Sequence, residues 1–501
     1  MNRDYLLAID QSTSGTKALV IDRSGAVIAR SEAGHRQIYP APGWVEHDPL
    51  EIYGNVIRVA RQALRGAGID ARRLAALTIT NQRETAVLWD RTTGLPVCNA
   101  IVWQCQRTSD DCARLREEGH EPVVRAKTGL KLDPYFSATK WRWMLDHAEG
   151  AKEKLEEGKL LAGTIDSWLV WKLTGGRVHA TDYTNASRTS LYNIYTLDWD
   201  EELCGLFGVP RRLLPEVKPS DEIFGYTDDP ELWEDQVPIT GVIGDSQAAL
   251  FGQRCHEPGM AKATYGTGTS VLMNIGGKPV SPGNGLVTAI AWGMGGTVTY
   301  ALEGIIRTSG DTIKWVRDDL GLFGTYEELD DLIRQLPDNQ GVYLVPAFVG
   351  LGAPYWDPDA RAAITGMSRS TGRAHVVRAA LESIAYQVCD AIELMRRESG
   401  IELSELRADG GASRNAALMQ FQADLLDKDV VASEVAELSA MGSAFLGGLG
   451  AGFWPSAERL PAGAGRRFEP AMGAAERERL IAGWHRAVRS VLKNRSAGEE
   501  A

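Results

Sequence analysis

Two stretches that lie about half the chain apart follow the same order of residue types, and this repeat is the strongest constraint on the fold. Near the start, the apolar run 5–10 is followed by a turn rich in Ser, Thr and Gly and by a second apolar run, 18–22. Downstream, the run 260–265 is followed by the turn 266–270 and the run 271–274. Each stretch predicts a β-hairpin with a tip of small polar residues. A repeat at half-length predicts two similar α/β domains that face a shared cleft.

Strand-like and helix-like segments alternate in the rest of the chain. The run 76–80 predicts a strand, and helices are expected around 49–66 and 139–159. In the second half, 375–397 has apolar residues at helical spacing and ends before Gly400, a helix-stop signal. This alternation predicts an α/β protein rather than an all-α one.

A third glycine-rich turn lies between a predicted strand, 406–409, and a helix expected from Ala416. Its sequence, Gly410-Gly411-Ala412-Ser413-Arg414-Asn415, exposes backbone N–H groups at a helix start and allows close approach of a flat or phosphorylated ligand. Alone, the turn also fits an ordinary strand-to-helix connection. Together with the two hairpin tips it predicts a nucleotide held between the domains. The chain has no G-x-x-x-x-G-K-[ST] string, which disfavours a P-loop NTPase.

Charge and composition narrow the range of partners. The chain of 501 residues has 54 Lys+Arg against 66 Asp+Glu, a formal charge of −12, so its average surface repels nucleic acid and anionic lipid. The six cysteines form no C-x-x-C pair, and no signal-peptide pattern opens the chain, so we expect a cytoplasmic protein. The run 438–454 is broken by Ser and Gly, so we expect a buried helix rather than membrane insertion.

Two acidic residues at predicted strand ends are candidates for chemistry. Asp10 ends the first strand, where a carboxylate can orient a hydrated Mg²⁺ on phosphate oxygens, although a turn-capping role fits equally well. Asp245 follows the strand 239–243 and precedes a helix-like segment. On this pattern alone, capping that helix is favoured over catalysis.

A small polyhydroxylated ligand is indicated by a further group of residues. Arg83 and Glu84 follow the strand 76–80 and offer donors and acceptors to hydroxyl groups. Trp103 and Tyr135 supply aromatic walls, although each aromatic alone is more often a core residue.

Long strings across nearly the whole chain resemble the FGGY family of carbohydrate kinases. The strings are 38–49, 79–84, 101–108, 133–140, 181–189, 265–268, 346–358 and 409–415. The resemblance implies two similar actin-like ATPase (ribonuclease H-like) domains, residues 1–252 and 253–501, that flank a central cleft. It also implies an enzyme that uses ATP and Mg²⁺. A homo-oligomer, a dimer or tetramer, is compatible with this reading.

The resemblance implies roles for individual residues. Asp10 would organise Mg²⁺, and Asp245 would accept the proton of the attacking hydroxyl. The nucleotide would be held by Thr13, Ser14, Lys17, Thr267, Gly268, Gly310, Lys314, Gly411 and Asn415. The polyol would be held by Arg83, Glu84, Trp103, Tyr135, Asp245, Ser246 and Ser270.

The implied reaction is ATP-dependent phosphorylation of a terminal hydroxyl of a small polyol, most simply glycerol to sn-glycerol 3-phosphate. Three positions depart from the family pattern: Lys17 stands where Arg is usual, Ser246 where Gln is usual, and Ser270 where Phe is usual. The two serines leave a longer polyol or ketose, a tetritol or pentitol type, as an alternative. A non-catalytic nucleotide sensor or chaperone-like ATPase on the same fold is a third reading, which retention of Asp10, Asp245 and the Arg83–Glu84 pair disfavours.

One surface loop carries a prediction about regulation. Some bacterial relatives have a Gly-rich basic loop that gathers the phosphates of fructose 1,6-bisphosphate. The matching stretch here, 228–235, is acidic. Because like charges repel, we expect no regulation by this anion.

Overall fold

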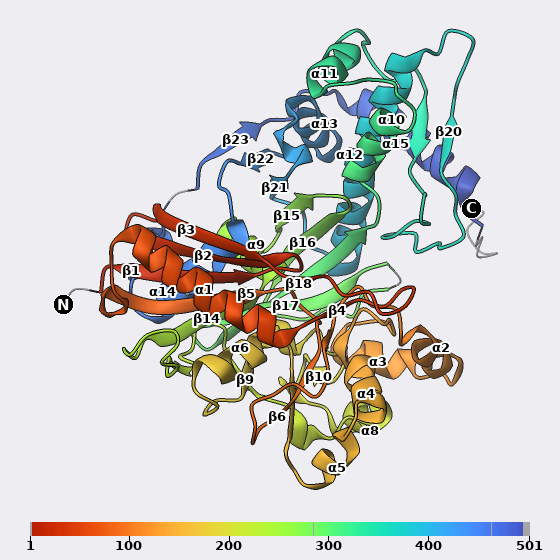
Figure 1. Cartoon of the computed structure of the whole chain (residues 1–501). Helices are drawn as coiled ribbons and strands as arrows, with labels where there is room; N and C mark the ends of the chain where they lie inside the picture. The colour runs from red at the N-terminus through yellow and green to blue at the C-terminus, as the bar shows by residue number, and fades with distance from the viewer. Residues whose placement is uncertain (1–2, 284, 462, 494–501) are drawn as a thin grey trace.

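One large β-sheet from each half of the chain forms the framework of the protein (Figure 1). The computed structural model describes residues 3–283, 285–461 and 463–493. The first sheet has the strand order β13-β14-β5-β1-β2-β3, and the second has the order β17-β18-β16-β15-β21-β22-β23.

In the first sheet, β1 and β2 form the predicted antiparallel hairpin, while β5 lies parallel to β1 and β14 parallel to β5. The carboxyl ends of β1, β5 and β14 therefore meet at one edge, where an α/β sheet commonly binds its ligands. The strands are β1 (Tyr5–Gln11), β2 (Gly15–Asp22), β3 (Val27–Gly34), β5 (Leu74–Asn81), β13 (Gly225–Tyr226) and β14 (Pro238–Gly244).

The second sheet repeats this plan. Its hairpin is β15–β16, β21 lies parallel to β15, and β22 lies parallel to β21. Read from its other edge, the second sheet has the order β23-β22-β21-β15-β16-β18-β17. Its first six strands correspond one to one with β13-β14-β5-β1-β2-β3 of the first sheet, and β17 is an additional edge strand. The expectation of two similar α/β domains is confirmed. The strands are β15 (Met260–Tyr265), β16 (Thr269–Gly276), β17 (Val287–Met294), β18 (Thr297–Ile306), β21 (Glu405–Gly410), β22 (Val430–Ser433) and β23 (Gly465–Phe468).

Helices cover the sheets and extend both halves outward. In Figure 1, α2 to α5 and α8 form a helical region below the first sheet, and α10 to α13 and α15 gather above the second. The helices of the first half are α1 (Pro49–Ala67), α2 (Ser109–Glu117), α3 (Glu121–Thr128), α4 (Ser137–His147), α5 (Ala151–Glu156), α6 (Ile165–Leu173), α7 (Tyr183–Ala186), α8 (Glu201–Phe207) and α9 (Asp245–Gly252). Those of the second half are α10 (Gly310–Asp318), α11 (Tyr326–Arg334), α12 (Arg373–Ser399), α13 (Ala416–Leu426), α14 (Leu438–Gly450) and α15 (Ala474–Val491).

Short strands pair outside the two main sheets. They are β4 (Glu46–His47) with β7 (Ala100–Ile101), β6 (Val87–Asp90) with β8 (Leu160–Gly163), β9 (Ala180–Asp182) with β12 (Glu216–Lys218), β10 (Tyr192–Asn193) with β11 (Asp198–Trp199), and β19 (Tyr343–Val345) with β20 (Ala363–Thr365).

Local signals explain where the predicted helices begin and end. The Asp48 carboxylate accepts a hydrogen bond from the Leu50 N–H at 2.8 Å and caps α1. Helix α12 ends at Gly400, whose φ of 70° is left-handed, as the stop signal predicted. The expected helical segment 139–159 is divided into α4 and α5 because the chain turns at Gly150, with a φ of 69°.

The glycine-rich helix α14 is buried, as predicted, but it packs on the sheet of the first half. A Cβ at Gly442 would lie 1.8 Å from the Ala248 carbonyl oxygen of α9, and one at Gly447 would lie 2.5 Å from the Thr78 side chain of β5. Only glycine permits these approaches. The core of the first sheet thus includes a helix from beyond residue 252, and the division at 252/253 stays a prediction. Within the described ranges, no helix is long and apolar enough to cross a membrane.

Candidate active site

Three strand ends bring the predicted acidic and basic residues to one edge of the first sheet. Asp10 is the penultimate residue of β1 and pairs with Thr80 of β5, and Gly244, which precedes Asp245, ends β14 beside Asn81. Arg83 and Glu84 follow β5 after one intervening residue. Residues far apart in the sequence therefore lie together because parallel strands end at a common edge.

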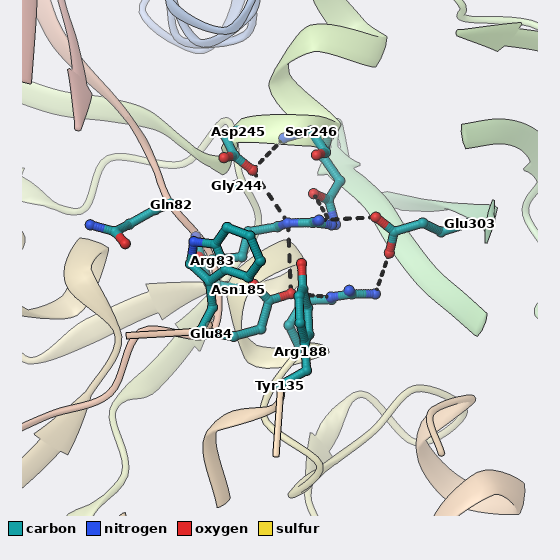
Figure 2. A network of polar contacts seen from close by, with 12 residues as sticks. Gln82, Arg83, Glu84, Tyr135, Asn185, Arg188, Gly244, Asp245, Ser246 and Glu303 are labelled. Carbon is teal, nitrogen blue, oxygen red and sulfur yellow. Dashed lines mark hydrogen bonds and ion pairs between the residues drawn. The ribbon is translucent and has the colours of Figure 1, made fainter. Parts of the chain in front are cut away.

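Four buried side chains of alternating charge form a closed network at this edge, which we call the charge ring: Arg83, Glu84, Arg188 and Glu303 (Figure 2). Glu303 contacts Arg83 Nη2 at 2.9 Å and Arg188 Nη1 at 2.6 Å through separate oxygens. Glu84 Oε1 lies 2.6 Å from Arg188 Nε and 3.7 Å from Arg83 Nε. All four residues are at most 5% exposed, so water does not screen these contacts.

The two carboxylates of the charge ring respond differently to the same burial. Burial raises the pKa of Glu303, but the Arg188 and Arg83 guanidinium groups outweigh it and hold that pKa at about 2. For Glu84, burial outweighs the same two cations and leaves the pKa raised. Glu84 also has a left-handed φ of 60°, and its carbonyl oxygen accepts a hydrogen bond from Ser137 Oγ at 3.0 Å. A non-glycine residue held in this conformation is typical of a functional position.

Asp245 does not cap α9 with its side chain. It is the first residue of α9, where Gly244 is the N-cap and no side chain caps the helix. The capping interpretation is therefore wrong. Asp245 Oδ1 accepts a hydrogen bond from Ser246 N at 2.7 Å and lies 3.3 Å from Arg83 Nε. The side chain is 36% exposed, so a ligand at this edge of the sheet can contact it.

The two predicted aromatic residues pack against each other and link the site to the first hairpin. The rings of Trp103 and Tyr135 have centroids 5.4 Å apart in an edge-on arrangement. Trp103 Nε1 donates a hydrogen bond to Thr13 Oγ1 at 2.9 Å, at the tip of β1–β2. A hydrogen bond thus joins the aromatic wall to the hairpin that is expected to hold phosphates.

Ser246 and Ser270 approach the site from the two halves of the chain. Ser246 is the second residue of α9. On β16, Leu272 pairs with Glu303 of β18. Ser270 lies two residues before Leu272, and residues two apart on a strand point to the same face. Ser270 and Glu303 therefore share one face of the second sheet. The Ser270 hydroxyl oxygen is buried and has no hydrogen-bond partner among the described residues.

A cavity of about 570 Å³ lies in the second half of the chain and gathers most of the predicted nucleotide residues. Its apolar side comes from Ile313, Leu329 and Leu381, which sequence reasoning did not identify and which suit a flat base. The predicted residues that line it are Thr267, Gly310, Lys314, Gly411 and Asn415.

Two of the predicted nucleotide residues, Asn415 and Gly268, support the structure around the cavity and do not offer a free side-chain group to a ligand. Asn415 Oδ1 accepts from Leu418 N at 2.9 Å and caps α13, and its Nδ2 donates to Asp330 Oδ1 at 2.7 Å. Both polar atoms of Asn415 are thus engaged within the protein. Gly268 does not line the cavity, and a Cβ there would lie 2.4 Å from the Ile306 carbonyl oxygen. Its lack of a side chain lets the hairpin tip lie against β18.

A second cavity, of about 730 Å³, connects this region to the first sheet. It shares Gly411 and Arg414 with the first cavity and reaches Asp10 and Glu437. Burial, then the charges of Asp245 and Glu437, raise the pKa of Asp10 to about 7, against the lowering effect of Lys17. The two cavities are therefore neighbours, one with an apolar wall and the other with the buried carboxylate.

The hairpin residues Ser14 and Lys17 lie apart from the apolar cavity. Ser14 is exposed at the tip of β1–β2. Lys17 Nζ forms an ion pair with Glu437 Oε2 at 2.6 Å, which joins β2 to the residue before α14. Glu437 has a left-handed φ of 61°, and sequence reasoning did not single it out.

The side chains near Asp10 suit a metal ion that is bound mainly by substrate phosphates and water. Among the described residues, no group of three or more His, Cys, Asp or Glu side chains is placed to hold a metal ion. Mg²⁺ commonly keeps several waters and is bound by one or two carboxylates with substrate phosphates. Asp10, which lines the larger cavity, fits that mode.

Arg188, Glu303 and Lys262 are candidate functional residues that sequence reasoning missed. Arg188 lies inside the string 181–189, where no role was assigned, and Glu303 lies inside an otherwise apolar strand. A charged residue within a buried strand is a signal that could have identified Glu303. Lys262 is 1% exposed on β15, and its Nζ donates to Thr264 Oγ1 at 2.9 Å.

Comparisons with known proteins agree with this geometry. Residues 5–252 match the N-terminal domain and residues 261–451 the C-terminal domain of the model for the FGGY family of carbohydrate kinases. A glycerol kinase of Xanthomonas axonopodis pv. citri is 53% identical over 98% of this chain and 99% of its own length. Glycerol kinase 2 of Thermotoga maritima is 51% identical over 97% of this chain and 98% of its own. A crystal structure of Plasmodium falciparum glycerol kinase with ADP superposes with a TM-score of 0.93 at 36% identity, covering 97% of this chain and 98% of that chain.

Proposed function

The chain belongs to the FGGY family of carbohydrate kinases, and we propose that it transfers the γ-phosphoryl group of ATP to a terminal hydroxyl of glycerol, giving sn-glycerol 3-phosphate. One observation carries the proposal. Asp245 stands beside Arg83 at 3.3 Å with its carboxylate partly exposed, at the same strand edge as Asp10. Asp10 lines a cavity that shares Gly411 and Arg414 with the cavity of the predicted nucleotide residues. An acceptor site and a donor site therefore share one cleft.

The residues of the chain account for the acceptor half of the reaction. Glu84 engages the charge ring through Oε1, so its Oε2 can accept a hydrogen bond from a substrate hydroxyl. Trp103 and Tyr135 cover the carbon backbone of the polyol. Asp245 accepts the proton of the attacking hydroxyl as the oxygen–phosphorus bond forms and the bond to the ADP oxygen breaks.

Positioning and charge supply most of the catalysis in a transfer of this kind. Mg²⁺ held by Asp10 and the phosphate oxygens would neutralise charge on the transferring group. The backbone of the hairpin tips and of Gly410-Gly411 offers N–H donors to the phosphates, and the cavity with Leu329 and Leu381 takes the base.

The choice of glycerol and ATP rests on the relatives. Two relatives are glycerol kinases that are 51% and 53% identical over almost the whole chain, and one solved glycerol kinase at 36% identity contains ADP. The assembly of Asp245, Arg83 and Glu84 at the cleft disfavours a non-catalytic nucleotide sensor, which has no need of a polyol site with a base.

A second candidate substrate, a longer polyol or ketose, is favoured by one observation. The buried Ser270 hydroxyl lacks a partner on the face shared with Glu303. A buried hydroxyl left without a partner costs about 1–3 kcal/mol, so an additional CHOH unit of a substrate could occupy this position.

An acceptor screen tests both candidates. ADP release is measured with ATP and Mg²⁺ and with glycerol, erythritol, threitol, xylitol, ribitol or xylulose, and the product is identified by ³¹P NMR. We expect ADP release to require an acceptor and to be fastest with glycerol. ADP release at the same rate with and without every acceptor would contradict the kinase proposal.

A further inference from the structure

One member of the charge ring comes from the second half of the chain. Arg83, Glu84 and Arg188 all belong to the first half, whereas Glu303 lies on β18 of the second sheet. Figure 2 shows Glu303 reaching from that strand toward both guanidinium groups. The arrangement of the predicted polyol site is therefore completed by the second domain.

Charge and geometry explain why two carboxylates are present. The charge ring contains two cations and two anions, all buried, and a buried charge without a partner is strongly unfavourable. Glu303 uses one oxygen for Arg83 at 2.9 Å and the other for Arg188 at 2.6 Å. Without it, Glu84 would be the only carboxylate of the ring for two guanidinium groups, and its Oε2 would turn toward them instead of toward a ligand.

The other contacts of Arg83 show that its orientation is fixed from several sides. Its Nη1 donates to Gln247 Oε1 at 3.2 Å, and its Nε faces Asp245 at 3.3 Å. Gln247 and Asp245 belong to α9. Glu303 therefore acts on the guanidinium group that stands beside the proposed base, without being placed next to the base itself.

The strand that carries Glu303 also leads to the nucleotide side. Strand β18 ends at Ile306, and α10 begins shortly afterward at Gly310, which lines the apolar cavity. The Gly310 N–H donates to the Gly266 carbonyl oxygen at 3.0 Å, at the tip of β15–β16. One strand thus joins the charge ring to the region predicted to hold ATP.

We propose that Glu303 is a positioning residue for polyol recognition: it holds Arg83 and Arg188 so that Glu84 keeps one oxygen free for a substrate hydroxyl. The inference rests on the proposed function, because it concerns the same site. The kinetic parameters of a Glu303 variant distinguish this positioning role from a purely structural one. A residue that only joins the domains changes the fraction of folded enzyme, which lowers kcat and leaves both KM values unchanged.

The test compares Glu303→Gln with Glu382→Gln. Glu382 is a matched control because it is also buried in the second half of the chain and pairs with an arginine, Arg378, at 2.6 Å. We expect Glu303→Gln to raise KM for glycerol at least tenfold and to leave KM for ATP within twofold. Glu382→Gln should leave both within twofold. Unchanged KM for glycerol in Glu303→Gln, with or without a loss of kcat, would overturn the inference.

A further variant covers the case in which Glu303→Gln does not fold. Glu303→Asp keeps the charge but is too short to bridge both guanidinium groups. It should show the same selective rise in KM for glycerol, and a value within twofold of wild type in folded Glu303→Asp would overturn the inference.

Direct binding distinguishes this inference from the proposed function. Glycerol is titrated calorimetrically into wild type and Glu303→Gln in the presence of a non-hydrolysable ATP analogue. A Kd at least tenfold weaker in the variant supports the role of Glu303 even if no phosphoryl transfer is observed. Equal affinities overturn the role while leaving the kinase proposal intact, and wild type that binds no polyol overturns both.

Discussion

Lys17 Nζ lies 2.6 Å from Glu437 Oε2, so the basic residue of the first hairpin is already paired with the residue that precedes α14. Both side chains are partly accessible, at 35% and 14%, and Glu437 lines the larger cavity. For Lys17 to contact phosphate, as the family resemblance implies, its ammonium group must share its donors between the ligand and this carboxylate, or leave the carboxylate.

Removing the competing carboxylate should therefore tighten nucleotide binding. Glu437→Gln frees Lys17, and because partly exposed ion pairs contribute about 0.2–1 kcal/mol, we expect KM for ATP to fall by roughly 1.4- to fivefold. Glu434→Gln is the control, since Glu434 lines the same cavity and is exposed. Initial rates at varied ATP decide the matter, and a raised KM in Glu437→Gln would show that Glu437 assists the nucleotide instead.

Magnesium activation should depend on pH through Asp10. Its pKa is raised to about 7, so the carboxylate form that binds a cation predominates above that pH and is lost as pH falls. We expect the Mg²⁺ concentration for half-maximal rate to rise from pH 8 to pH 6, approaching about tenfold per unit below the pKa. Rates measured across a Mg²⁺ series at each pH test this. A half-maximal concentration that stays constant from pH 8 to pH 6, after correction for Mg²⁺–ATP binding, would contradict the assignment.

Much of this site was predictable because it lies at the ends of parallel strands with strong apolar patterns. Residues 5–10, 76–80 and 239–243 were identified as strands, and the side chains that follow them meet in the structure. Asp245 shows the limit, because its local pattern favoured helix capping, whereas Gly244 is the N-cap of α9 and the Asp245 carboxylate lies beside Arg83. Glu303 could not be placed, since its partners Arg83 and Arg188 are distant in the sequence and the pairing depends on how the two sheets face each other.

Fructose 1,6-bisphosphate should have no effect on the rate. In the acidic loop 228–235, the Asp229 carboxylate accepts a hydrogen bond from the Tyr53 hydroxyl, and Asp228 is paired with Arg177. An anion at this loop would meet carboxylates rather than free N–H groups. Rates are measured with the bisphosphate at millimolar concentration, with sodium sulfate as an ionic-strength control. Inhibition by the bisphosphate alone would show that this expectation is wrong.

Ser270→Phe should change the order of acceptors if a longer polyol uses the room beside Glu303. A Phe side chain buries roughly 150–250 Å², so it would occupy space that an additional CHOH unit needs. We expect the ratio of kcat/KM for erythritol to that for glycerol to fall at least fivefold in the variant. Ser270→Ala is the control for loss of the hydroxyl alone. An unchanged ratio in Ser270→Phe would mean that Ser270 does not border the acceptor.

Comparing glycerol-dependent ADP release in wild type and Asp245→Asn tests whether Asp245 activates a glycerol hydroxyl for attack on ATP. We expect acceptor-dependent ADP release with one glycerol 3-phosphate formed per ADP, and a kcat lower by roughly 10²–10⁴ in the variant, with ATP affinity and thermal unfolding unchanged. A variant that keeps near wild-type kcat, or a wild type whose ADP release does not depend on glycerol, would contradict this mechanism.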